Sequence, residues 1–213
     1  MSLASKTTKE ARRLAALERL ALLDTEREER FDQITRVAKT FFEVPIVLFS
    51  VVGSTQCWMK SVQGMDLQQA DRSTSLCDPT LDSKELLVIN DMRLDPRSSN
   101  NPLVTGPEQL RFYAGIPVHS DDGHRIGVLS VMDIQPREFN RLQQGQLRDF
   151  ALLLETQVRI RSEEKSITDQ NLKMGVITRW AGGRGSELGT QSGAGALAFL
   201  ALVLVLALGI RSE

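Results

Sequence analysis

The two cysteines are the residues of this sequence whose chemistry most needs explaining. Cys77 lies in a polar, turn-rich run, Arg72-Ser-Thr-Ser-Leu-Cys-Asp-Pro-Thr-Leu81, between two segments that we predict to be strands. A reactive thiolate needs a nearby cation or histidine that lowers its pKa. No histidine lies within several residues of Cys77, and the adjacent Asp78 disfavours a negative charge on the sulfur. The sequence therefore favours Cys77 as a residue of a pocket wall over a nucleophile.

Neither the second cysteine nor the histidines change this view. Cys57 lies beside Trp58 in a predicted strand, and a free cysteine in such a place usually packs as a small apolar side chain. His119 and His124 flank Asp121 and Asp122, but a tight Asp-Gly hairpin accounts for all of these residues without a metal. We therefore predict that the chain has no catalytic residue and no metal site, and is not an enzyme.

A strand near the middle of the chain offers better candidates for ligand contact. Alternation along this strand places Arg111, Tyr113 and Gly115 on one face, and an apolar set on the other: Phe112, Ala114, Ile116 and Val118. A cation and a phenol on a mostly apolar surface can orient a small ligand. Alternatively, Arg111 pairs with an acid of the 91–95 loop and only fixes that loop. We predict a ligand-binding set whose ligand, and any cofactor, are unknown: Trp58, Cys77, Asp91, Arg111 and Tyr113.

The apolar pattern predicts an α+β domain. Helical spacing predicts amphipathic helices at 9–23 and 27–44 and a long helix at 138–166. The 27–44 helix should bury Phe31, Ile34, Val37, Ala38 and Phe41. Short apolar or alternating runs predict strands at 44–52, 56–62, 85–90, 110–120 and 125–134. We predict irregular structure at 66–82 and a long loop at 92–109. This order predicts an antiparallel sheet of five to six strands with the N- and C-terminal helices on one face and pocket-forming loops on the other.

Composition restricts the class of protein. A chain of 213 residues with 41% hydrophobic and 25% charged residues is typical of a folded globular protein. Its formal net charge of -1 predicts no nucleic-acid partner, because such proteins usually carry a strong basic excess. The first thirty residues are charged throughout and contain no signal peptide, so we expect a cytoplasmic domain.

The C-terminal region has a different composition. A Gly/Ser-rich stretch predicts a linker over 167–193, and an uncharged apolar segment follows at 194–210. That segment is near the lower length limit for crossing a bilayer. It could anchor the domain to the inner membrane, begin the membrane region of a longer protein, or be an extension foreign to the domain.

Several motifs together resemble one family. The loop Pro102-Leu-Val-Thr-Gly-Pro107 leads into the strand Arg111-Phe-Tyr-Ala-Gly-Ile-Pro117. The strand Gly127-Val-Leu-Ser-Val-Met-Asp133 and the step Pro136-Arg-Glu-Phe139 follow. Over about residues 12–160 the chain resembles the GAF sensor domains of bacterial signalling proteins. This resemblance implies a helix at 1–24 followed by a GAF-like sensor domain at 25–166.

The resemblance also implies a function. Such a domain is a non-catalytic sensory module that binds a small molecule, forms a homodimer through its helices, and acts on an output protein such as a kinase or a cyclase. Relatives that bind bilins carry a Cys-His pair, whereas Asp78 follows Cys77 here, so a bilin is disfavoured. Two alternatives stay open: a small redox enzyme that uses Cys77, and a degenerate module that only dimerises.

Overall fold

The computed structural model describes residues 3–185. Their regular elements follow one another along the chain in this order: α1 (Leu3–Leu20), α2 (Glu29–Phe42), β1 (Ile46–Val52), β2 (Gln56–Gln63), β3 (Gln69–Asp71), the 3-10 helix η1 (Arg72–Thr74), α3 (Cys77–Asp82), β4 (Leu87–Ile89), α4 (Pro102–Thr105), β5 (Phe112–His119), β6 (Arg125–Asp133) and α5 (Arg141–Gly185). Residues 1–163 form one compact unit, and a second unit begins at Glu164.

The strands form a six-stranded sheet in the order β3-β2-β1-β6-β5-β4. All neighbouring strands are antiparallel. Strands β5 and β6 are joined by the predicted hairpin, in which Gly123 has a φ of 77°. A positive φ is favoured by glycine because it has no Cβ. The predicted α+β class with an antiparallel sheet is confirmed.

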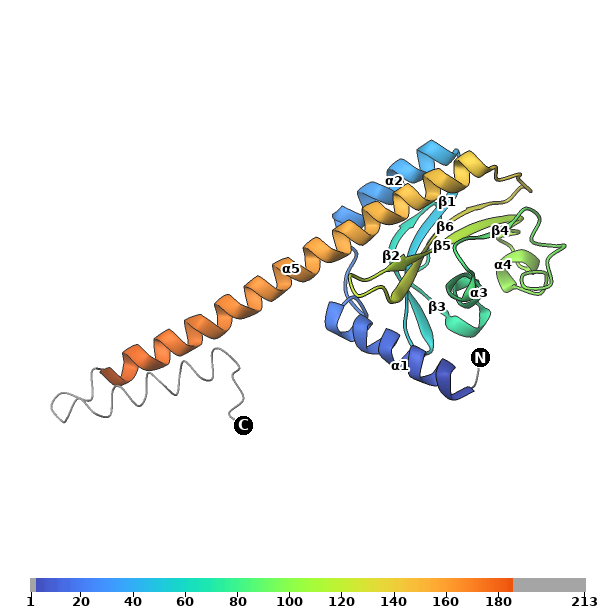
Figure 1. Cartoon of the computed structure of the whole chain (residues 1–213). Coiled ribbons are helices and arrows are strands. Elements are labelled where there is room, and N and C mark those ends of the chain that lie inside the picture. Colours follow the sequence, from blue (N-terminus) through green and yellow to red (C-terminus); the bar gives the residue numbers. More distant parts are fainter. Residues whose placement is uncertain (1–2, 186–213) are drawn as a thin grey trace. The chain divides into compact units, whose positions relative to one another are not determined.

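The two faces of the sheet carry two separate apolar clusters. On one face, Phe112, Ala114, Ile116 and Val118 pack with buried residues of α1, α2 and α5, as their alternation predicts. Figure 1 shows α2 and the first part of α5 together over this face, and α3 and α4 on the opposite side. The second cluster includes Tyr113 and lies under α3 and α4. The fold therefore reserves one face of the sheet for helix packing and the other for a site.

The predicted buried face of helix α2 is only partly right: Phe31 and Ala38 are buried as predicted, and Ile34 is partly buried against the same cluster. Val37 and Phe41 are 59% and 49% exposed, whereas Phe31, Thr35, Ala38 and Phe42 are buried. Thr35 takes a core position because its hydroxyl lies 2.6 Å from Ser61 Oγ, which satisfies both polar groups. The prediction was wrong for Val37 and Phe41 because it used apolar residues alone to choose the buried face.

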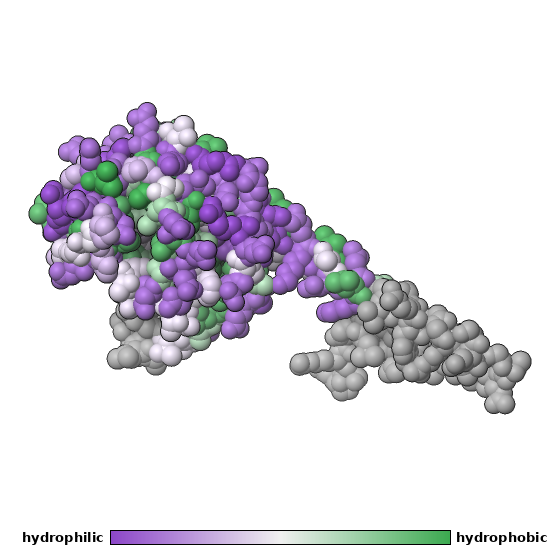
Figure 2. All heavy atoms as spheres, turned by 180° about the vertical axis from the view of Figure 1, so that it is seen from behind, coloured by the Kyte–Doolittle hydropathy of each residue, from purple (hydrophilic) through white to green (hydrophobic). Residues whose placement is uncertain are grey.

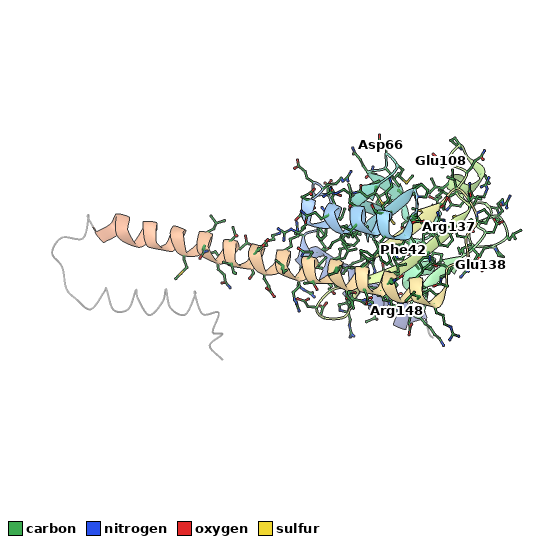
Figure 3. The ribbon with its side chains drawn as sticks, turned by 90° about the horizontal axis from the view of Figure 1, so that it is seen from above. Phe42, Asp66, Glu108, Arg137, Glu138 and Arg148 are labelled. Carbon is green, nitrogen blue, oxygen red and sulfur yellow. The ribbon has the colours of Figure 1, made fainter. Side chains whose placement is uncertain are left out.

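Helices α2 and α5 lie side by side, as Figure 3 shows from above. Phe42 and Phe150 contact each other with ring centroids 5.6 Å apart. Before α5 begins, Arg137 donates to the carbonyls of Phe42 and Glu43, the second at 2.6 Å. These contacts join the chain before α5 to the C-terminal end of α2.

On the face seen from behind, hydrophilic residues predominate and hydrophobic ones form small groups (Figure 2).

Helix α5 continues to Gly185, beyond the predicted end at residue 166 and into the predicted linker. The glycine-rich sequence begins only at Gly182, so the preceding residues of the predicted linker are compatible with a helix. The remainder of that linker and the apolar segment 194–210 lie outside the described residues. Among the helices of the described chain, none is both long and apolar enough to cross a membrane.

Candidate functional site

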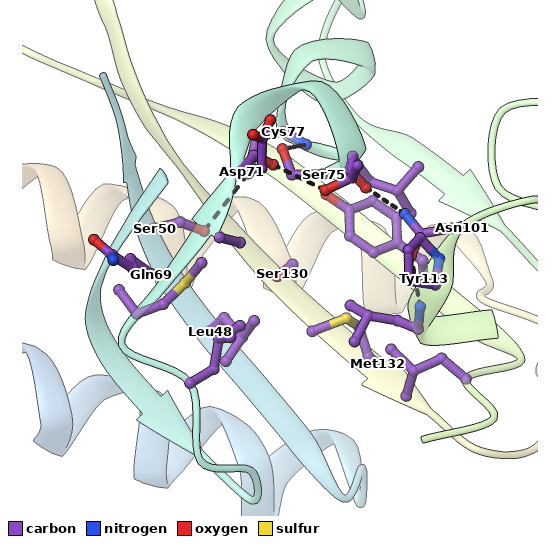
Figure 4. Close-up of a pocket in the computed structure, with 18 of the residues that line it drawn as sticks. Leu48, Ser50, Gln69, Asp71, Ser75, Cys77, Asn101, Tyr113, Ser130 and Met132 are labelled. Carbon is purple, nitrogen blue, oxygen red and sulfur yellow. Dashed lines mark hydrogen bonds between the residues drawn. The ribbon is translucent and has the colours of Figure 1, made fainter. Parts of the chain in front are cut away.

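A cavity of about 240 Å³ lies between the sheet and the segments that carry α3 and α4 (Figure 4). Its wall is mostly apolar, with Leu48, Met59, Leu110 and Met132 among the lining residues. An apolar cavity of about 150 Å³ is already large enough to bind benzene. Asp71 is the one charged residue among those lining the cavity in the described chain. The cavity therefore suits a small molecule that is mostly apolar and not anionic.

Tyr113, the single tyrosine of the sequence, lines this cavity. Its hydroxyl lies 2.7 Å from Thr80 Oγ1, which itself donates to the Leu76 carbonyl at 2.7 Å, so Tyr113 donates to Thr80. Burial raises the pKa of Tyr113, which keeps the phenol neutral. A Cβ at position 115 would lie 2.2 Å from the Tyr113 hydroxyl oxygen. Gly115 therefore leaves the space in which the Tyr113 ring lies.

Helix α3, which forms one side of the cavity, is fixed at both ends by arginines. Arg72 Nε donates to Asp78 Oδ1 at 2.7 Å near its start. Near its end, Arg125 donates to the carbonyls of Leu81, Ser83 and Lys84, the last two at 2.6 and 2.9 Å. Because these arginines come from different parts of the chain, they fix α3 relative to the sheet.

Helix α4 is connected to the same region through Asn101. The Asn101 side-chain oxygen accepts from the Leu103 amide at 2.9 Å and caps α4. Its amide nitrogen donates to the Thr74 carbonyl at 2.5 Å. Asn101 lines the cavity, as Figure 4 shows, and was not among our candidates. An asparagine before a proline predicts a turn, but the contact with Thr74 depends on the fold.

The structure brings together only two of the five predicted ligand-binding residues. Cys77 and Tyr113 line the cavity, whereas Trp58, Asp91 and Arg111 are not among its lining residues. Whether any of the five contacts a ligand stays a prediction.

The predicted residues that do not line the cavity, Trp58, Asp91 and Arg111, make other contacts instead. Arg111 precedes β5, so strand alternation does not govern its direction; it donates to the carbonyls of Val104 and Leu110 at 3.0 and 2.9 Å. Asp91 forms an ion pair of 2.6 Å with Arg93 rather than with Arg111. Trp58 is half-buried in β2 and pairs with Gln69 of the edge strand β3.

The pKa values of the two cysteines are shifted in opposite directions. Cys77 begins α3, and its hydrogen bond with Cys57 and its burial raise its pKa. A hydrogen bond from Cys77, with a further one from Ser75, lowers the pKa of Cys57. Sequence reasoning treated Cys57 as a packing residue, because nothing in the local sequence shows that α3 returns to β2.

The histidines make ordinary hairpin and helix contacts. His119 Nδ1 lies 2.8 Å from Glu155 Oε1, and Asp122 contacts Ser120 and Arg19. Within the part of the chain that the structure describes, no group of three His, Cys, Asp or Glu residues is placed to hold a metal ion.

Two solved structures share the fold. The chain resembles the free methionine-R-sulfoxide reductase of Neisseria meningitidis with a TM-score of 0.53 and 20% identity, over 63% of this chain and 78% of that one. It resembles the type II enzyme of Thermoplasma acidophilum with a TM-score of 0.52 and 16% identity, over 61% of this chain and 90% of that one. Identities this low establish the fold alone.

A curated relative is more similar in sequence. The chain is 35% identical over 125 residues, 59% of its length, to a cyclic di-GMP phosphodiesterase of Pseudomonas aeruginosa. The match covers 21% of the relative, so the chain spans about a fifth of that protein's length.

The prediction that the chain is not an enzyme is contradicted by these comparisons. Both solved structures are reductases, and the curated relative is named a phosphodiesterase. The resemblance to a sensor family had suggested a purely non-catalytic module, but proteins that share this fold include enzymes.

The family itself is shown by a match to a whole-domain model. The model of the GAF domain matches residues 2–158, a span that includes the entire sheet and the cavity. A GAF domain supports a sensory or regulatory role for this region. The chain belongs to the GAF domain family.

Proposed function

We propose that this GAF domain is a sensor that binds a small, neutral and mostly apolar molecule in the cavity under α3 and α4. The single observation that supports this proposal most strongly is the cavity itself, which is about 240 Å³ in volume and is lined mainly by apolar side chains. A few convergent polar groups on a mostly apolar surface are typical of small-molecule sites.

The charges at the cavity support the neutral class of ligand. The lining residues in the described chain include Asp71 and neither lysine nor arginine. Phosphate groups are usually bound by arginine, lysine or helix N-termini. A cyclic nucleotide would therefore lack the cations that its phosphate needs in this cavity.

Binding and signalling are connected by α3 in this proposal. A ligand that contacts the cavity side of α3 would alter the position of Asp78 and thereby of Arg72, which also pairs with Glu10 of α1. A ligand can shift the equilibrium between two conformations only through its different affinity for each. The output is then a change at the terminal helices, which act on a separate partner such as a kinase or a cyclase.

The test uses the full chain and small neutral probes. We expect phenol, indole or cyclohexanol to raise the melting temperature, by an amount that grows with ligand concentration and with affinity, and cyclic AMP to leave it unchanged. Ser130→Leu, which fills the cavity from β6, should abolish the shift, while Ser166→Leu on an exposed part of α5 should retain it. If Ser130→Leu does not fold, Ala70→Leu on the edge strand replaces it. A shift that survives the filled cavity, or no shift with any neutral probe, contradicts the proposal.

A homodimer is the second part of this proposal. Several large apolar side chains of α2 and α5 are exposed within the first unit: Val37, Phe41, Leu142, Leu152 and Leu153. Exposed apolar patches commonly mark protein interfaces. Light scattering after size exclusion should give the mass of a dimer, and Phe41→Lys with Leu153→Lys should give a monomer. A monomeric wild-type chain contradicts this part.

A further inference from the structure

The two cysteines meet in the second apolar cluster, although they come from separate elements. Cys57 lies on β2 and is fully buried, and Cys77 is the first residue of α3 and is 7% exposed. Both belong to the same cluster of buried residues on the cavity face of the sheet. We call these two residues the thiol pair.

Serine hydroxyls surround the thiol pair on both sides. Cys57 Sγ lies 3.4 Å from Ser75 Oγ, and the same oxygen accepts from the Cys77 amide at 3.2 Å. Cys77 Sγ lies 3.8 Å from Ser50 Oγ (Figure 4). The Ser75 hydroxyl donates to the Arg72 carbonyl at 3.0 Å, so the neutral Cys57 thiol donates to Ser75 Oγ. A hydroxyl that turns to donate to a thiolate stabilises its charge, which a purely apolar packing site does not do.

The two thiols also affect each other's ionisation. The Cys77 thiol lowers the pKa of Cys57, to which Arg72 adds a favourable charge while Asp78 opposes it, and Cys57 raises the pKa of Cys77. The negative charge is therefore favoured on Cys57. This is the arrangement in which one thiolate attacks an oxidant and the neighbouring thiol resolves the product.

The cavity reaches the thiol pair at Cys77. Cys77 and Ser75 both line the cavity, whereas Cys57 is not among the lining residues of the described chain; Ser75 Oγ lies 3.4 Å from its sulfur. A molecule as small as a peroxide fits a space of about 240 Å³ that accommodates larger ligands. Other side chains of the cavity wall offer no competing thiol, because Cys57 and Cys77 are the two cysteines of the sequence.

We propose that the thiol pair is a redox site at which a hydroperoxide forms a disulfide between Cys57 and Cys77. The Cys57 thiolate attacks the terminal peroxide oxygen, the O–O bond breaks, and the departing oxygen takes a proton to give water or an alcohol. Cys57 is then a sulfenic acid. The Cys77 sulfur attacks the Cys57 sulfur, the S–O bond breaks, and the hydroxyl leaves as water with the Cys77 proton. Two thiols are oxidised and one hydroperoxide is reduced.

The disulfide would join α3 covalently to β2. Since α3 forms one side of the cavity and is otherwise fixed through Arg72 and Arg125, oxidation would restrict the same helix that a ligand contacts. Formation of the disulfide does not depend on the proposed ligand, so the two proposals can fail independently.

The experiment measures which thiols remain after oxidation of the folded full chain. The chain is treated with hydrogen peroxide, freed of oxidant, unfolded, alkylated with iodoacetamide and weighed by mass spectrometry. We expect neither thiol to be alkylated after oxidation, and the mass of the chain to show no gained oxygen atom. Digestion should give one disulfide-linked pair of peptides that contain Cys57 and Cys77, and dithiothreitol should restore both thiols. The folded chain should form this bond at least about tenfold faster than the chain in urea, because the fold holds the sulfurs together.

Two single variants complete the test. Cys57→Ser should leave Cys77 alkylatable at a peroxide dose that oxidises the wild type, since burial still raises the pKa of the remaining thiol after Cys57, the largest cause of the shift, is removed. In the Cys77→Ser variant, the reaction should end with an oxidised Cys57, and no intramolecular disulfide should form. The proposal is overturned if both thiols of the wild type stay alkylatable, or if the folded and unfolded chains form the disulfide at the same rate.

Discussion

Arg72 Nη1 lies 2.6 Å from Glu10 Oε1, so a residue just before α3 is paired with a residue of α1. The same carboxylate accepts from Arg13, whose guanidinium is buried and donates to the Val52 carbonyl at 2.6 Å. Arg72 also contacts Asp78 of α3. Glu10 therefore connects the N-terminal helix, the end of β1 and the cavity-forming helix through one carboxylate.

Replacing Glu10 should weaken this connection. We expect Glu10→Gln to lower the free energy of unfolding by about 1 kcal/mol, a value that allows for solvent screening of a partly exposed pair. Urea denaturation followed by circular dichroism measures the change. Glu18→Gln, an exposed position on the same helix, should have almost no effect. Equal losses for the two variants would show that the Arg72 contact is not stabilising.

The contribution of Glu10 should also depend on pH. Hydrogen bonds from Arg13 and Arg72 lower the pKa of Glu10 from 4.5 to about 2. A carboxyl whose pKa is lowered by folding stabilises the protein fully above its unfolded pKa and loses this effect as pH falls toward the folded value. The difference in unfolding free energy between wild type and Glu10→Gln should therefore be constant above about pH 4.5 and shrink toward pH 2. A difference that persists unchanged at the acid end contradicts the lowered pKa.

The sheet and its helix-facing side could be predicted because their signals are local. The Asp-Gly turn at Gly123 and the alternation of Phe112 and Ala114 are visible in a few consecutive residues. The buried face of α2 was predicted only in part because Thr35 is polar, and its partner Ser61 is distant in the chain. A local pattern cannot show that a distant hydroxyl will satisfy a buried one.

The cavity could be predicted only in part. Helix α3 has six residues, too few for helical periodicity to appear, and Pro79 is compatible with its first turn. Tyr113 was found because strand alternation places it opposite Phe112. Arg111 was misplaced because it lies just outside β5, and the contact of Cys57 with Cys77 was missed because it needs α3 to lie against β2.

Gly115 and Tyr113 should depend on each other. An added Cβ at Gly115 would overlap the Tyr113 ring, so we expect Gly115→Ala to lower the unfolding free energy by roughly 1–3 kcal/mol. Tyr113→Leu removes the ring, and the cost of Gly115→Ala in that background should fall by at least about 0.5 kcal/mol. A double-mutant cycle by urea denaturation measures this coupling. Additive losses would mean that the tyrosine ring does not occupy the space over Gly115.

Arg125 should control the local stability of α3. Its guanidinium donates to three carbonyls at the end of this helix. The ammonium group of a lysine cannot place its N–H donors in the same planar arrangement. We expect Arg125→Ala to accelerate amide exchange in α3 by about tenfold or more while β1 stays protected, since short elements open locally. Arg125→Lys should give an intermediate rate. Hydrogen exchange with mass spectrometry resolves these segments.

The matched control for Arg125 is Arg93→Ala, which removes an arginine from an exposed ion pair with Asp91. It should leave exchange in α3 unchanged. If Arg125→Ala accelerates exchange equally in α3 and β1, the arginine stabilises the whole domain rather than this helix. If α3 keeps its protection, the helix is held by the cavity side chains and by Arg72 alone, and a ligand in the cavity would then be the main control on its position.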